Sequence, residues 1–195
     1  MEITSIFGLP AHPLFVHVPV VLVPLAALGA VLMLWPTLRA KFGWATVVLA
    51  FVGLVFTQLA IGSGQALEEH VRETGLLERH IDMGENLRPW ALLLFGFTLA
   101  AMLWDWWTKR EAAKTEAAGS EAAASGRSVS ATTAQRVSLG LCVLAILSGA
   151  LSTYWVYEIG HSGAKATWEK TQVKIDKGIG NGGEGGEGGE SGEGG

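Results

Sequence analysis

The stretch LFVHVPVVLVPLAALGAVLMLW, residues 14–35, decides the fold class. It contains no Asp, Glu, Lys or Arg, and it is long enough to cross a bilayer as an α-helix, which needs about 20 apolar residues. Pro19 and Pro24 lie inside the stretch, where a helix within a bundle can accommodate them. The stretch therefore predicts the first transmembrane helix of an integral membrane protein.

Three further apolar blocks follow the first, over about residues 44–64, 89–107 and 137–159. Charged or Gly-rich segments separate them, and 49% of all residues are hydrophobic. Apolar residues gathered into long blocks are typical of membrane proteins. The sequence therefore predicts an all-α fold, a four-helix transmembrane bundle, with the lipid bilayer as its partner. A net charge of −4 gives no reason to expect a nucleic-acid partner.

A chain of 195 residues is expected to form one domain. We assign residues 1–13 to an N-terminal segment and residues 14–168 to the membrane domain. The second helix continues beyond its apolar part as an amphipathic pattern, and Thr74-Gly75 is a typical helix stop. The second and third helices are therefore expected to extend outside the membrane as a helical hairpin, with Pro89 near the membrane surface.

Two polar segments connect or follow the predicted spans. Residues 109–135 are rich in Ala, Ser, Thr, Gly and Glu, which predicts a cytoplasmic linker that is part helix and part flexible. Residues 169–195 form a C-terminal tail, which repeats Gly-Gly-Glu from about residue 178 onward. Such a composition cannot bury an apolar core, so disorder is predicted from that point.

The distribution of Lys and Arg predicts the orientation of the chain in the membrane. Seven of these residues lie around the loop after the first span and the loop after the third. They are Arg39, Lys41, Lys109, Arg110, Lys114, Arg127 and Arg136. The hairpin on the opposite side has Arg72, Arg79 and Arg88, which its acidic residues outnumber. Because cytoplasmic loops carry the excess of Lys and Arg, both termini are predicted to lie outside the cytoplasm.

All five histidines are predicted to lie at the outer side of the bundle. His12 and His17 lie at the outer end of the first span, His70 ends the second helix, His80 begins the third, and His161 follows the fourth. His17 lies about one turn inside its span, where an imidazole that faced lipid would be unfavourable. We therefore expect it to point into the bundle and to find a partner there.

The second helix carries a polar stripe that leads toward the histidines. Gln58, Gly62, Gln65 and Glu69 are spaced four, three and four residues apart, so they share one helix face. We interpret this stripe, which runs from the level of the histidines into the membrane, as the wall of a site. Cys142, the single cysteine, is expected to be a small buried apolar residue.

Several functions fit histidines in this pattern, and the residues leave them open. A Zn or Cu ion could bind through His17, His70, His80 or His161, with Glu69 as a carboxylate ligand. Haem b requires only two histidines on facing helices of an apolar bundle. The imidazoles could instead hydrogen-bond helix ends together, or take part in proton-linked transport. No nucleophile elbow or metalloprotease spacing is present, so we expect a non-catalytic protein.

The N-terminal sequence resembles that of a known family. Residues 9–19, LPAHPLFVHVP, are similar to the opening of the bacterial multi-pass membrane family catalogued as domain of unknown function 2231. That family has His-Pro before the first span, a second His-x-Pro one turn later, a His that begins the third helix, and a His-Gly-like element after the last helix. Here His12, His17, His80 and residues 161–164 match these positions.

The resemblance covers about residues 7–168 and implies a multi-spanning membrane domain without an assigned activity. His70 and the long hairpin do not match the family pattern. The resemblance therefore implies that a shared site would be formed by the other four histidines, His12, His17, His80 and His161.

These observations lead to a hypothesis for the function. We expect a histidine-lined haem or metal site at the outer face, which would serve electron transfer or metal handling with a redox or membrane-protein partner. His17, His80 and His161 are the first candidate ligands, followed by His12 and His70. One alternative is a structural or interaction subunit with no bound centre. Another is a small transporter, although the sequence has no internal inverted repeat.

Overall fold

The computed structural model describes residues 5–6, 9–68, 75–118 and 130–181. These residues form β1 (Ser5–Ile6), β2 (Leu9–Pro10), α1 (Ala11–Leu32), α2 (Pro36–Glu68), α3 (Gly75–Ala118) and α4 (Ala131–Asn181). The two short strands pair antiparallel, with Ile6 opposite Leu9. Each of the four helices is long and apolar enough to cross a membrane. α2, α3 and α4 each contain one predicted span, whereas the first predicted span, residues 14–35, extends three residues past the end of α1. The all-α four-helix fold is therefore confirmed.

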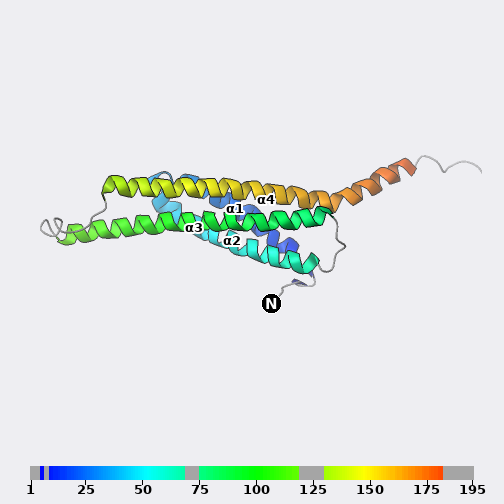
Figure 1. Ribbon diagram of the computed structural model, residues 1–195, viewed down its shortest axis with the longest axis horizontal. Helices are drawn as coiled ribbons and strands as arrows, with labels where there is room; N and C mark the ends of the chain where they lie inside the picture. The colour runs from blue at the N-terminus through cyan, green and yellow to red at the C-terminus, as the bar shows by residue number, and fades with distance from the viewer. Residues whose placement is uncertain (1–4, 7–8, 69–74, 119–129, 182–195) are drawn as a thin grey trace, which may run out of the picture.

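The helices form a bundle in which successive helices run in opposite directions (Figure 1). α1 packs against α2 and α4, and α3 packs against the same two helices, so α1 and α3 lie diagonally opposite each other. One end of the bundle contains His12 and His80 and is called the histidine end. The other contains Arg39 and Asp105 and is called the arginine end.

Small residues occupy much of the interior of the bundle, beside larger ones such as Met33 and Leu94, while other large apolar residues cover its outside. On α1, Ala26 and Ala30 are fully buried, whereas Leu14, Val21 and Leu28 are 58%, 60% and 64% exposed. These exposed residues recur at every seventh position and form one stripe on the outer face of the helix. Small inward residues let membrane helices approach closely, and large apolar residues on the outside suit a lipid environment.

The contact between α1 and α4 illustrates this packing. A Cβ atom added at Gly149 would lie 2.8 Å from the Cβ of Ala27, so only glycine fits there without a shift of the helices. Ser148 and Ser152 are buried beside it, and their hydroxyls donate to the carbonyls of Leu144 and Ser148 at 2.8 Å each. Hydroxyls that are satisfied within their own helix can be buried inside a membrane bundle at little cost.

Two features go beyond the sequence-based expectations. The N-terminal segment includes the β1–β2 pair, and α4 continues to Asn181, well past the end of its predicted span. The predicted onset of disorder near residue 178 falls in the last turn of α4, and residues 182–195 lie outside the described part of the chain. The predicted linker is helical at both ends, and its middle, residues 119–129, also lies outside the described part.

Candidate functional site

A polar layer crosses the bundle interior at the histidine end. Each helix contributes one residue to it: His12 from α1, Ser63 from α2, His80 from α3 and Ser162 from α4. We call these four residues the histidine layer. Because α1 and α3 are diagonal neighbours, the two imidazoles meet across the middle of the bundle.

The hydrogen bonds of His12 identify the nitrogen that carries its proton. Its Nδ1 lies 2.8 Å from the carbonyl oxygen of Ala60 on α2. A carbonyl can only accept, so Nδ1 bears the hydrogen and donates it. Ser63 supports this contact, because its hydroxyl donates to the same carbonyl at 3.1 Å and lies 3.5 Å from Nδ1. In the neutral ring, Nε2 of His12 therefore keeps an unprotonated lone pair.

His80 is held in the same way by the other half of the bundle. Its Nδ1 lies 3.0 Å from the hydroxyl oxygen of Ser162 on α4. That hydroxyl donates its own hydrogen to the carbonyl of Ile159 at 2.9 Å, so its oxygen accepts from His80. Nδ1 of His80 is therefore also the protonated nitrogen, and its Nε2 also keeps a lone pair in the neutral ring.

The two imidazole rings are close enough to act together. Their centroids are 6.4 Å apart, and the ring planes are nearly perpendicular, at 83°. In both rings the Nδ1 proton is directed to a neighbouring helix, to α2 for His12 and to α4 for His80. The pair therefore presents two unprotonated nitrogens on adjacent rings, which is the state in which an imidazole binds a metal.

A glycine follows the serine in each half of the layer and leaves space for the ring. A Cβ atom at Gly64 would lie 3.1 Å from Cε1 of His12, and one at Gly163 would lie 3.1 Å from Cε1 of His80. The α1–α2 and α3–α4 hairpins thus hold their histidine rings in the same way. In each, a histidine near the start of the first helix packs against a Ser-Gly pair of the second.

The other two described histidines lie outside this layer. His17 is exposed on the outer surface of α1 rather than directed into the bundle as expected, and its Nδ1 donates to the carbonyl of Pro13 in its own helix at 2.5 Å. His161 is also exposed, and its ring stacks on Tyr157 of the same helix, with centroids 6.0 Å apart and planes at 5°. The structure thus brings His80 together with His12, and not with His17 or His161.

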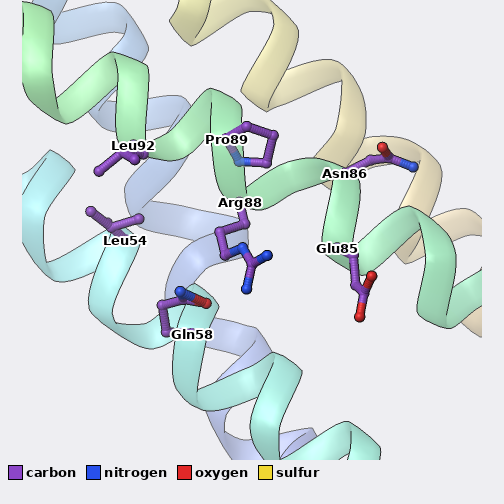
Figure 2. Close-up of a pocket in the computed structure, with 7 residues that line it drawn as sticks. All are labelled: Leu54, Gln58, Glu85, Asn86, Arg88, Pro89 and Leu92. Carbon is purple, nitrogen blue, oxygen red and sulfur yellow. The ribbon is translucent and has the colours of Figure 1, made fainter.

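Two of the remaining predicted site residues, Gln58 and Gln65, lie at the surface between α2 and α3. His70 and Glu69 lie outside the described residues. Gln65 is exposed, and its amide donates to the Glu85 carboxylate of α3 at 3.2 Å. Gln58 is exposed and lines a groove between the two helices (Figure 2). The polar stripe therefore faces α3 from the outside, and the α2 residue that touches His12 is Ser63.

Sequence reasoning missed the two serines of the histidine layer. A signal was present, because Ser63-Gly64 and Ser162-Gly163 are two Ser-Gly pairs at the predicted level of the histidines. No third ligand accompanies the two imidazoles: within the described ranges, no group of three or more His, Cys, Asp or Glu side chains is placed to hold a metal ion. The site therefore consists of two imidazoles, each of which donates a hydrogen bond to a carbonyl or hydroxyl oxygen.

A second polar group, which the sequence did not predict, occupies the arginine end. Arg39 of α2 is buried, donates to the hydroxyl of Ser138 and to Sγ of Cys142 on α4, the latter at 3.7 Å, and pairs with Asp105 of α3 at 3.5 Å. Lys109 reaches Asp105 as well, at 2.7 Å. We call Arg39, Asp105, Ser138 and Cys142 the arginine cluster. Cys142 is fully buried, as expected.

Comparison with known proteins agrees with this architecture. A family model described as a predicted membrane protein, domain of unknown function 2231, matches residues 8–176. The chain belongs to this family. The match covers α1, α2 and α3 in full and α4 as far as residue 176, and it includes every residue of the histidine layer. Membership makes the chain a multi-pass membrane protein, as the four apolar helices also indicate. No curated protein and no solved structure matches the chain.

Proposed function

We propose that this protein is an electron-transfer subunit that binds a b-type haem through Nε2 of His12 and of His80. The observation that supports this most strongly is the matched hydrogen bonding of the two rings. Metal-bound histidines usually donate their second ring N–H to a carbonyl or a similar acceptor, which fixes the tautomer and orients the ring. Both imidazoles already have such a bond, to Ala60 and to Ser162.

The number of ligands favours haem over a bare ion. Zn sites use three or four protein ligands, whereas haem supplies four nitrogens itself and needs only axial ligands from the protein. Only two imidazoles meet in the histidine layer, and no group of three potential ligands occurs in the described part of the chain. Small residues (Ser63, Gly64, Ser162 and Gly163) flank both rings on α2 and α4.

The separation of the rings supports the same proposal. With metal–nitrogen bonds of about 2 Å, two imidazoles on opposite sides of one metal have centroids roughly 6 to 6.5 Å apart. The observed centroid separation is 6.4 Å. The centroid separation therefore already suits two axial ligands of one metal, and binding of the macrocycle would need local adjustment of the residues around the rings.

The test is a visible absorption spectrum of the purified protein, recorded oxidised and after dithionite reduction. The wild-type protein, produced in cells with adequate haem, should show a sharp Soret band and an α-band in the difference spectrum. His12→Ala and His80→Ala should each remove the low-spin bands. His17→Ala and His161→Ala serve as matched controls and should retain them, because both of these imidazoles are exposed on the surface.

Other results would redirect the assignment. A colourless sample with stoichiometric Zn or Cu, lost in His12→Ala, would replace the haem with a metal ion. A colourless, metal-free sample would leave the histidine layer as a hydrogen-bonded structural layer, and the protein as an interaction subunit. Bands that persist in His80→Ala but disappear in His17→Ala would contradict the choice of ligands.

We also propose that the histidine end faces away from the cytoplasm. The connections between the helices support this orientation, since Lys41, Lys109, Arg110 and Arg136 flank the opposite end of the bundle, whereas acidic residues outnumber basic ones in the hairpin at the histidine end. Four spans place both termini on one side of the membrane, which in this orientation is the outer side. A cysteine introduced at His161 should react with a membrane-impermeant maleimide in intact spheroplasts. Labelling only after lysis would reverse the orientation.

A further inference from the structure

A groove of about 610 Å³ lies between α2 and α3, on the outside of the bundle. Its lining residues come from both helices, and Figure 2 shows Arg88 and Leu92 of α3 extending toward Gln58 and Leu54 of α2. They are Leu54, Gln58, Glu85, Asn86, Arg88, Pro89 and Leu92. The groove shares no residue with the histidine layer, so whatever occupies it is independent of the proposed haem.

The groove crosses the boundary between the polar and the apolar part of α3. Glu85 and Arg88 precede Pro89, and the apolar run of the third span begins directly after it. On the apolar side, Leu92 is 54% exposed and faces Leu54 of α2 (Figure 2). A change from charged to apolar side chains along a membrane helix marks the level of the lipid headgroups. The groove therefore joins a headgroup region to an acyl-chain region.

Two hydrogen-bonding side chains in the groove are available to a ligand. Arg88 extends from α3 toward Gln58 of α2 (Figure 2), yet within the described residues neither side chain has a hydrogen-bond or ion-pair partner. An arginine near the end of a membrane helix extends its side chain to the interface, where lipid phosphates are polar partners. A guanidinium group is well suited to a phosphate, because its N–H groups can donate to two oxygens at once.

Glu85 adds an opposite charge one helical turn from Arg88. Residues three apart on a helix have Cβ atoms about 5–6 Å apart, comparable with the span of an ethanolamine phosphate. Gln65 donates to one carboxylate oxygen of Glu85 at 3.2 Å, and no ion pair joins Glu85 to Arg88 in the described part of the chain. The groove thus has one cationic and one anionic group, each able to bind a group of opposite charge.

We propose that this groove binds a phospholipid with a zwitterionic ethanolamine headgroup. The phosphate is bound by Arg88 and Gln58, and the ammonium group by Glu85. One acyl chain lies along Leu54 and Leu92. A phosphatidylglycerol headgroup offers the phosphate but no ammonium, so it binds more weakly beside the Glu85 carboxylate.

The test is native mass spectrometry of the full chain in mild detergent, titrated with dioleoyl phosphatidylethanolamine or dioleoyl phosphatidylglycerol. The wild-type protein should bind the ethanolamine lipid severalfold more tightly. Arg88→Gln should weaken binding of both lipids about tenfold, as expected for the loss of a charge-assisted contact. Glu85→Gln should remove the preference for the ethanolamine lipid. Arg79→Gln, an exposed arginine of the same helix outside the groove, is the matched control and should bind as the wild type does.

Each other outcome overturns part or all of the proposal. Equal binding by Arg88→Gln and Arg79→Gln would exclude the groove as the lipid site. Equal or tighter binding of phosphatidylglycerol by the wild type would exclude the ethanolamine assignment, and displacement of the lipid by millimolar inorganic phosphate would indicate a free anion as the ligand. If Arg88→Gln fails to fold, Leu54→Trp, which fills the groove from α2, should abolish binding instead. Retained binding by that variant would exclude the site.

Discussion

The two ends of the bundle hold their polar groups in different ways. At the histidine end, each imidazole donates to an acceptor in its own hairpin, and within the histidine layer the two hairpins meet through the two rings. At the arginine end, Arg39 contacts residues of both α3 and α4, so one side chain connects three helices. A guanidinium is a permanent cation, whereas an imidazole binds a metal in its neutral form.

This difference suggests that the two ends of the bundle have different roles. Breaking the arginine cluster would leave a buried charge without its partner, which is among the more costly changes a bundle can undergo. The histidine layer contains no permanent charge, and the lone pairs of its two Nε2 atoms are not used in holding the hairpins together. The arginine end is therefore expected to hold the helices in register, while the histidine end can accept a ligand without losing its internal hydrogen bonds.

The variant Arg39→Met is the strongest test of this difference between the two ends. The variant leaves Asp105 with only Lys109 as a charged partner and removes the donor to Ser138. We expect the free energy of unfolding to fall by about 2 kcal/mol, because Asp105 loses its buried partner and keeps only the exposed Lys109. Reversible unfolding in sodium dodecyl sulfate, followed by circular dichroism, would measure the change.

A double variant and a surface control make this prediction specific. Arg39→Met combined with Asp105→Leu should recover much of the lost stability, since both buried charges are then absent. Lys114→Gln, which removes an exposed pair with Glu111, should change the free energy of unfolding by less than about 0.5 kcal/mol. A loss in Arg39→Met as small as that of Lys114→Gln would mean that the arginine cluster does not hold the bundle together.

The sequence predicts the four helices because the length of an apolar block is a local property. It does not predict the arginine cluster, because the burial of Arg39 depends on Asp105 and Ser138, which are 66 and 99 residues away along the chain. In the sequence, Arg39 is one of the loop cations that predict the orientation of the chain in the membrane, and nothing there indicates that it is buried. Its position in the first turn of α2, facing α3 and α4, follows from how three helices pack, and no local pattern contains that information.

The histidines show which part of a site the sequence predicts and which part it does not. Their common position at one end follows from the spans, but the direction in which each faces depends on helix phase and packing. His17 follows His12 by five residues, which rotates it about 140° around the α1 axis, so both cannot face the interior. His161 precedes Ser162 by one residue and lies about 100° from it. That His12 and not His17 meets His80 depends on the diagonal arrangement of α1 and α3, which the sequence alone did not supply.

The two halves of the histidine layer differ in one respect, and this gives the smallest predicted effect. His12 has a direct bond of 2.8 Å to the Ala60 carbonyl, and Ser63 is only a secondary contact at 3.5 Å. His80 instead donates to the Ser162 hydroxyl at 3.0 Å, and the Ile159 carbonyl is a further backbone partner for its ring. The α3–α4 half therefore depends more on its serine than the α1–α2 half does.

Ser162→Ala should accordingly lower the free energy of unfolding by about 1 kcal/mol, the usual contribution of one hydrogen bond. The loss stays near that value because the Ile159 carbonyl can take over part of the bond from His80. Ser63→Ala is the matched control and should cost less, since His12 keeps its bond to Ala60. The same unfolding assay measures both variants. Equal losses would mean that the two hairpins hold their imidazoles equally, whereas a larger loss in Ser63→Ala would show that His12 relies on the hydroxyl rather than on the backbone of α2.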